Sequence, residues 1–126
     1  MIGFEDGTRR IIDPSTSEGR RLLSQCRSAL CHVDAICACF IKGSDVREQV
    51  ESNSSYVKIV YSEAQSVSFF GTGSLVKYKS TTAEVWFFLS GYWKSNLLIL
   101  NGYDDHWEDT IWGMYGIRNI NRWIQT

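Results

Sequence analysis

The sequence predicts a single α+β domain over residues 1–126: an N-terminal helix packed on a five- or six-stranded, mainly antiparallel sheet, with a C-terminal helix. Two observations support this class. Helical periodicity is clearest near the two ends of the chain, whereas the middle alternates with a period of two and its predicted strands are joined by short links. Thirteen of the seventeen aromatic residues lie in residues 64–126, and no linker separates them from the rest. We therefore expect one domain in which the helix comes first along the chain and the sheet follows.

The first predicted helix has the strongest local signals. Pro14 stands near its first turn, and Ser15 with Glu18 three residues later forms a capping-box pattern. Apolar residues then recur at helical spacing, namely Leu22, Leu23, Cys26, Ala29, Leu30 and Val33. The residues between them are mostly polar or basic, so we expect an amphipathic helix of about five turns that packs on one side only.

The next segments are shorter. Residues 35–41 form an apolar run that ends at Lys42-Gly43, which favours a buried strand and leaves a continued helix as the alternative. Residues 44–51 predict a short capped helix. Residues 56–61 alternate as a strand, and the glycine-containing stretch 71–74 predicts a hairpin between residues 67–70 and 75–78.

The later strands are more aromatic. Residues 85–89 are apolar throughout, which predicts a central strand covered on both faces. Tyr92-Trp93 is expected to continue or re-enter the sheet, and residues 97–100 form the next strand. The chain closes with apolar residues at helical spacing, which predicts the C-terminal helix; these are Ile117, Ile120, Trp123 and Ile124.

Composition limits the function. Lys and Arg number 13 and Asp and Glu 14, giving a formal net charge of −1, which argues against direct binding of nucleic acid. No apolar run approaches the roughly 20 residues that span a bilayer. The first residues carry acids before any apolar stretch, so no secretory signal is predicted and a cytoplasmic location without membrane association is expected.

Four cysteines lie within fourteen positions, at Cys26, Cys31, Cys37 and Cys39. Their spacing does not match the paired ligands of a structural zinc site, and a reducing cytosol disfavours disulfides. We expect packed core thiols, with metal binding or redox chemistry as alternatives. No cofactor or metal is predicted.

The most unusual segment is acidic and aromatic. It contains Tyr103, Asp104, Asp105, Trp107, Glu108 and Asp109 around His106. Rigid aromatic side chains are typical of interface cores, and clustered carboxylates steer association with a basic partner. This pattern predicts a partner-binding surface. The alternatives are a solvated loop, whose acids favour the N-terminus of the next element, and a metal or catalytic site.

Two other functions remain open from the residues alone. A small lyase or isomerase, or a ligand carrier, would need a sheet-lined pocket, with Asp105 or His106 as the base of an enzyme. A cavity of roughly 300 Å³ or more would favour this reading. A sugar-binding module would need exposed, coplanar aromatic rings. Its candidate residues are Trp86, Tyr92 and Trp93, with Asn96 and Asn101 nearby.

At the level of a class, the chain resembles the small cytosolic immunity proteins of bacterial toxin–immunity systems. The resemblance rests on its single-domain size, the absence of a signal or a catalytic motif, the predicted helix on an aromatic sheet, and the acidic–aromatic segment at residues 103–109. It implies a non-enzymatic protein that binds a cognate toxin and occludes the toxin's active site. A basic nuclease is one toxin class that would fit the acidic segment.

Overall fold

The fold is an antiparallel sheet with helices, as a computed structural model shows for residues 1–42, 48–51, 53–70, 77–101 and 111–126. The strands are β1 (Ile2–Gly3), β2 (Arg9–Arg10), β3 (Val33–Lys42), β4 (Tyr56–Phe70), β5 (Lys77–Phe88), β6 (Asn96–Asn101) and β7 (Ile111–Ile117). The labelled helices are α1 (Ser17–Leu30) and α3 (Ile120–Trp123), and residues 48–51 are also helical. The predicted α+β class and the antiparallel sheet are confirmed.

The sheet contains seven strands in the order β2-β1-β4-β5-β6-β7-β3, and every pair of neighbours is antiparallel. The count exceeds the five or six strands expected because β1 and β2 have only two residues each, too few to show a periodicity. Residues 56–61 and 67–70, expected as separate strands, belong to the single strand β4. The register of β4 against β5 shifts between Val60 and Gln65.

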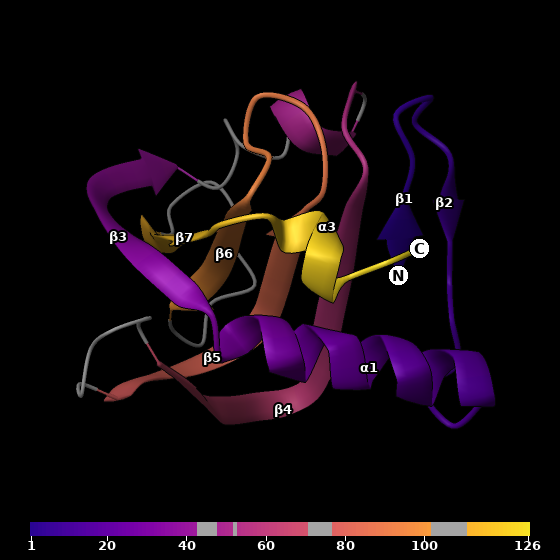
Figure 1. Cartoon of the computed structure of the whole chain (residues 1–126), viewed down its shortest axis with the longest axis horizontal. Coiled ribbons are helices and arrows are strands. Elements are labelled where there is room, and N and C mark those ends of the chain that lie inside the picture. The colour runs from indigo at the N-terminus through magenta and orange to yellow at the C-terminus, as the bar shows by residue number, and fades with distance from the viewer. Residues whose placement is uncertain (43–47, 52, 71–76, 102–110) are drawn as a thin grey trace.

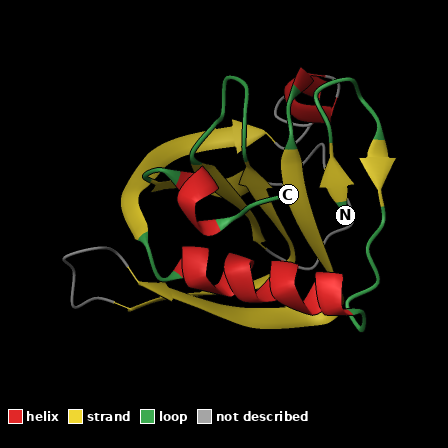
Figure 2. Cartoon of the chain, turned by 45° about the vertical axis from the view of Figure 1, so that its right-hand side comes forward, coloured by secondary structure: helices red, strands yellow, loops and turns green. Residues whose placement is uncertain are grey.

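The sheet curves around the helices. Figure 1 shows α1 and α3 on the same side of it, with α1 crossing in front of β4 and β5. Figure 2 shows from a second direction that β3 and β4 bend around the two helices. The N- and C-terminal ends lie near each other on the side of β1 (Figure 1).

The core lies between α1, α3 and the sheet. Its buried members are Ile2, Leu22, Cys26, Ala29, Leu30, Val57, Val85, Phe87, Leu89, Ile117, Ile120 and Ile124. Strand residues that alternate with these point to the opposite face, where Tyr56, Trp86 and Phe88 are also buried. The prediction that residues 85–89 form a central strand covered on both faces is therefore confirmed.

The N-terminal cap of α1 differs from the expected one. The cap residue is Thr16, whose hydroxyl accepts a hydrogen bond from the Gly19 amide at 3.1 Å. Ser15 is engaged with Asp13 instead, since its amide and its hydroxyl both donate to the Asp13 carboxylate. The helix has 14 residues and ends at Leu30, so Val33 belongs to β3.

The predicted C-terminal helix is reduced to one turn. Ile117 ends β7, and Asn119 adopts a left-handed conformation (φ 54°) that turns the chain into α3. Ile120 and Ile124 are buried, as the apolar spacing suggested. Ile117, Ile120 and Ile124 are spaced three and four residues apart and pack into the same core. The first lies in a strand, the second in a short helix and the third in the extended end of the chain.

Candidate functional site

The acidic–aromatic segment at residues 103–109, which includes all six predicted contact residues, lies outside the described residues. The chain on either side of it is described: β6 ends at Asn101 and β7 begins at Ile111. These strands are neighbours in the sheet. The partner surface predicted for this segment remains a prediction.

Two of the four cysteines have described side chains. Cys26 is buried and Cys31 is exposed, and both are free thiols, so the expectation of a packed core thiol is wrong for Cys31. Burial raises the pKa of Cys26 to about 12, against a smaller lowering effect of the nearby Met1 amine. At neutral pH this thiol is protonated and packs as a small apolar group, as expected. Within the described part of the chain, no cluster of three or more His, Cys, Asp or Glu side chains could hold a metal ion.

Trp86 is a core residue and not a surface platform. Its ring is 1% exposed and lies 4.9 Å from the Tyr56 ring. Lys58 places its ammonium 4.7 Å from the ring centroid and 3.6 Å from Glu84, whose carboxylate also accepts a hydrogen bond from the indole nitrogen. The two opposite charges offset each other, which lowers the cost of holding both groups in a partly buried position on this face of the sheet.

Tyr92 and Trp93 remain at the surface. We call residues 90–95, which connect β5 to β6, the aromatic turn. Contrary to the prediction, this pair does not continue the sheet. The turn is the orange loop at the top of Figure 1, next to the short magenta helical segment. Its sequence is rich in serine and glycine, which explains why the strand stops there.

The backbone of the aromatic turn is held at several points. Gly91 and Ser95 both have positive φ, 79° and 66°. The Ser95 amide donates to Phe88, and its carbonyl accepts from the Ile117 amide at 2.8 Å. The Ser90 hydroxyl accepts hydrogen bonds from the amide and the hydroxyl of Ser55, at 2.8 and 2.9 Å. The turn is thus tied to strands on both sides.

This backbone presents two rings in different environments. Tyr92 is 85% exposed, whereas Trp93 is half-buried and donates its indole N–H to Gln49 at 2.8 Å. The rings meet edge to face, with centroids 5.0 Å apart and planes at 84°. A sugar platform of coplanar rings is therefore not formed by these residues.

A hollow of about 440 Å³ lies beside the two rings. Its volume exceeds the roughly 300 Å³ that favours a ligand pocket, but it is open to solvent and none of the described residues that line it belongs to a strand, so it is not the sheet-lined pocket that an enzyme or ligand carrier would need. It is lined by Gln49, Asn53, Ser54, Gly91, Tyr92 and Trp93. Its polar groups are neutral amides and hydroxyls, which can donate and accept hydrogen bonds but carry no charge. Chemically, the site can bury a flat or apolar group against the rings and orient it by hydrogen bonds.

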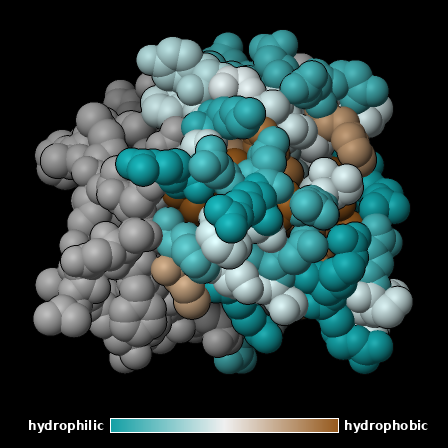
Figure 3. Space-filling model, in the orientation of Figure 1, coloured by the Kyte–Doolittle hydropathy of each residue, from teal (hydrophilic) through white to brown (hydrophobic). Residues whose placement is uncertain are grey.

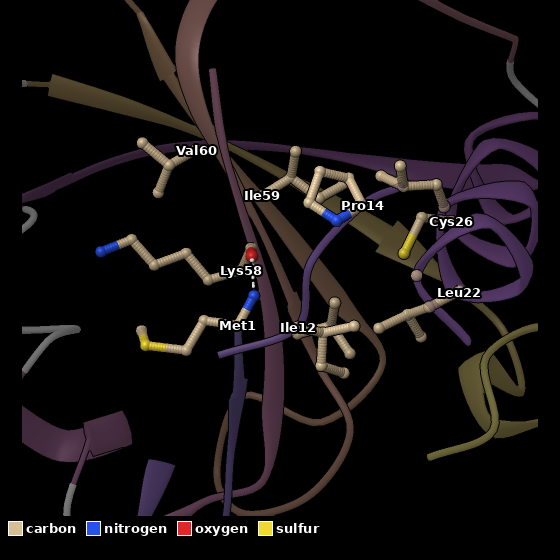
Figure 4. A pocket seen from close by; sticks show the side chains of 11 residues that line it. Met1, Ile12, Pro14, Leu22, Cys26, Lys58, Ile59 and Val60 are labelled. Atoms are coloured by element: carbon tan, nitrogen blue, oxygen red, sulfur yellow. Dashed lines mark hydrogen bonds between the residues drawn. The ribbon is translucent and has the colours of Figure 1, made fainter. Parts of the chain in front are cut away.

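A second, smaller hollow of about 120 Å³ lies between α1 and β4. Figure 4 shows Leu22 and Cys26 of α1 facing Ile59 of β4 across it, with Ile12 and Pro14 beside them. The Met1 amine donates to the Lys58 carbonyl at 2.8 Å, and burial lowers the pKa of that amine. The walls are mainly apolar. Its volume is well below the roughly 300 Å³ of a typical ligand pocket.

Comparison with known proteins adds no relative: no family model, no curated protein and no solved structure matches the chain. Among the described residues, no helix is long and apolar enough to cross a membrane. The aromatic turn is thus the candidate site with described geometry. The sequence patterns indicated the two rings as part of the sheet and as sugar candidates, not as a protein-binding site; the signal for a turn was Ser90-Gly91 before them and Lys94-Ser95 after them.

Proposed function

We propose that the chain is a cytoplasmic, non-enzymatic module that binds another protein through the aromatic turn. The observation that carries this proposal is the 85% exposure of Tyr92 on a backbone held by hydrogen bonds to both neighbouring strands. Tyrosine and tryptophan dominate binding hot spots because they bury a large area while losing little side-chain entropy. A ring kept exposed in this way is well suited to serve as an anchor.

The arrangement supports a protein partner better than a sugar. Tyr92 offers a ring face and a hydroxyl, while Trp93 supports it edge-on from a position fixed by Gln49. The adjoining hollow can receive a side chain of the partner, and its amides can bond to the partner's backbone. Such a neutral anchor favours binding that depends little on salt concentration.

The resemblance to immunity proteins makes the proposed partner a toxin, which would be neutralised by occlusion of its active site. In that proposal the acidic–aromatic segment supplies a second contact to a basic toxin such as a nuclease. The aromatic turn precedes β6 and residues 102–110 follow it. With six residues in β6, the two ends of this strand lie about 20 Å apart. A standard interface is wide enough to include both.

Site-specific photocrosslinking in the native host tests the proposal. A benzophenone side chain replaces Tyr92 in one variant, Tyr103 in a second and exposed Ser24 on α1 in a control. We expect position 92 to form an adduct with one protein, identified by mass spectrometry, that position 24 does not form. Absence of such an adduct at 92 from a folded, expressed chain would refute the binding site.

The toxin assignment has its own test. The captured protein, expressed alone, should arrest growth, and co-expression of this chain should restore it. Tyr92→Ala should weaken the protection. Charge reversal at Asp104 and Asp105 should slow association and make protection fail, while unchanged affinity across a salt series would count against a role for these acids. A captured protein without toxicity would leave a binding module and reject the immunity role.

A further inference from the structure

Strand β4 has an open edge next to β1. On that side, β1 pairs only with Tyr56 and Val57, and Met1 adds hydrogen bonds to the amide and carbonyl of Lys58, both at 2.8 Å. In an antiparallel strand, backbone groups two residues apart point to the same side. The amide and carbonyl of Val60 therefore point away from β5, along the line that β1 would follow if it were longer.

The side chain of Val60 is consistent with this opening. It is 60% exposed, which is unusual for a large apolar side chain on a strand near the core. The β4 strand has β1 and β5 as its only neighbours among the described strands. Beyond Lys58, its outer edge is accordingly free to accept hydrogen bonds from an added strand.

The apolar hollow lies directly beside this edge. Val57, Ile59 and Val60 line it from β4, and Leu22 and Leu23 line it from α1. Its volume of about 120 Å³ is close to that of apolar cavities, roughly 150 Å³, that admit a benzene-sized molecule. One medium-sized apolar side chain from an added strand would therefore fit.

The helix side of the hollow is positively charged. Arg20 and Arg27 stand three residues before and four residues after Leu23, so they flank it on the same stripe of α1. Both are exposed and neither forms an ion pair with any described residue. Arg27 also acts on Tyr61 of β4: burial raises the pKa of that phenol and Arg27 opposes the rise.

The acidic residues near this helix face are mostly engaged elsewhere. Glu18 pairs with Arg10, and the Asp13 carboxylate accepts hydrogen bonds from Ser15. Glu63 is exposed further along β4. Figure 3 shows that this face of the molecule is mainly hydrophilic, with apolar side chains visible near its centre and at a few other places.

We propose that the β4 edge and the hollow bind an extended segment of a partner protein. The segment adds as a strand beside Val60, inserts one apolar side chain into the hollow, and places acidic side chains against Arg20 and Arg27. Main-chain hydrogen bonds supply affinity and the hollow supplies selectivity, as in other cases of strand addition. This site shares no residue with the aromatic turn, so it stands independently of the proposed function.

Selection from a phage-displayed library of random peptides tests the proposal on the full chain. We expect enriched peptides to share one apolar residue with an acidic residue one or two positions away. Val60→Pro removes the amide that the added strand needs. The variant should still fold, because proline is tolerated at an edge position whose amide points outward. Val60→Thr is the matched control, because it keeps the amide and nearly the same shape.

A synthetic peptide of the enriched sequence should bind the wild-type chain and Val60→Thr within about twofold of each other, and Val60→Pro about tenfold more weakly, as expected for one lost hydrogen bond. The double variant Arg20→Glu/Arg27→Glu should also bind about tenfold more weakly at low salt. Circular dichroism checks that each variant folds. Amide exchange on the wild-type chain should show protection of Val60 when the peptide is bound.

Three results would overturn the proposal. No peptide is enriched; the enriched peptides bind Val60→Pro as well as Val60→Thr; or their binding is lost in Tyr92→Ala and kept in Val60→Pro, which would place them at the aromatic turn. If the double arginine variant binds the peptide as tightly as the wild-type chain, the proposal that the partner's acidic side chains contact Arg20 and Arg27 is wrong.

Discussion

Alkaline pH should destabilise the protein through Cys26. This thiol is 1% exposed in the core between α1 and the sheet. Its pKa rises from an ordinary 9.0 to about 12, mainly because burial disfavours the thiolate. Above pH 9 the unfolded chain releases the proton while the folded chain keeps it. The unfolded state is therefore favoured progressively as the pH rises from about 9 to about 12.

The size of the effect follows from the two pKa values. Each pKa unit corresponds to about 1.4 kcal/mol, so the three-unit difference amounts to about 4 kcal/mol once both states have titrated. At pH 10.5 the loss relative to pH 8 should already be about 2 kcal/mol. Below pH 9 the contribution is fully present and does not change with pH.

Urea unfolding in the presence of a reductant, at several pH values from 8 to 10.5, measures this loss. The control is Cys26→Ala, which has no thiol to titrate at this position. Every other titratable side chain is present in both proteins, so the pH dependence of the difference in the free energy of unfolding reports the titration at position 26. We expect the wild-type advantage to be constant up to about pH 9 and then to fall by about 2 kcal/mol. Parallel curves for the two proteins across the whole range would refute the reasoning.

Four further substitutions test local geometry. Gly91→Ala should lower the free energy of unfolding by about 2 kcal/mol, because φ is 79° and the added Cβ would lie 2.2 Å from the Ser54 hydroxyl. Gly7→Ala, with φ 87° but no described atom nearer than 3.9 Å to the added Cβ, should cost only about 1 kcal/mol in the same thermal or urea assay; equal losses would contradict the steric argument. Thr16→Ala should cost about 1 kcal/mol as the loss of a helix cap. Ser15→Ala should lower the free energy of unfolding by less than Thr16→Ala does. A larger loss for Ser15→Ala than for Thr16→Ala would identify Ser15 as the cap.

Local patterns were enough to predict part of the fold. The apolar spacing along residues 22–30 identifies α1, since side chains three and four residues apart share one face of a helix. The uninterrupted apolar run at residues 85–89 identifies the buried C-terminal part of β5, because a strand covered on both faces buries every side chain. In each case the information lies within a few consecutive residues.

Other features depended on contacts that no local pattern contains. Thr16 rather than Ser15 caps α1 because Asp13 occupies Ser15. The isoleucines near the C-terminus have helical spacing, yet a left-handed residue at Asn119 divides them between a strand and a single helical turn. Competing hydrogen bonds and backbone turns decided these points.

The sequence by itself determined the α+β class, the first helix and the central strand, because these follow from periodicity and burial within short segments. The tertiary structure alone decided what each aromatic side chain does. Trp86 is buried beneath Lys58, whereas Tyr92 is exposed beside Trp93, which is held by Gln49 from 44 residues earlier in the chain. The same residue types became core in one place and surface in the other, because burial depends on which distant segments cover a given face of the sheet.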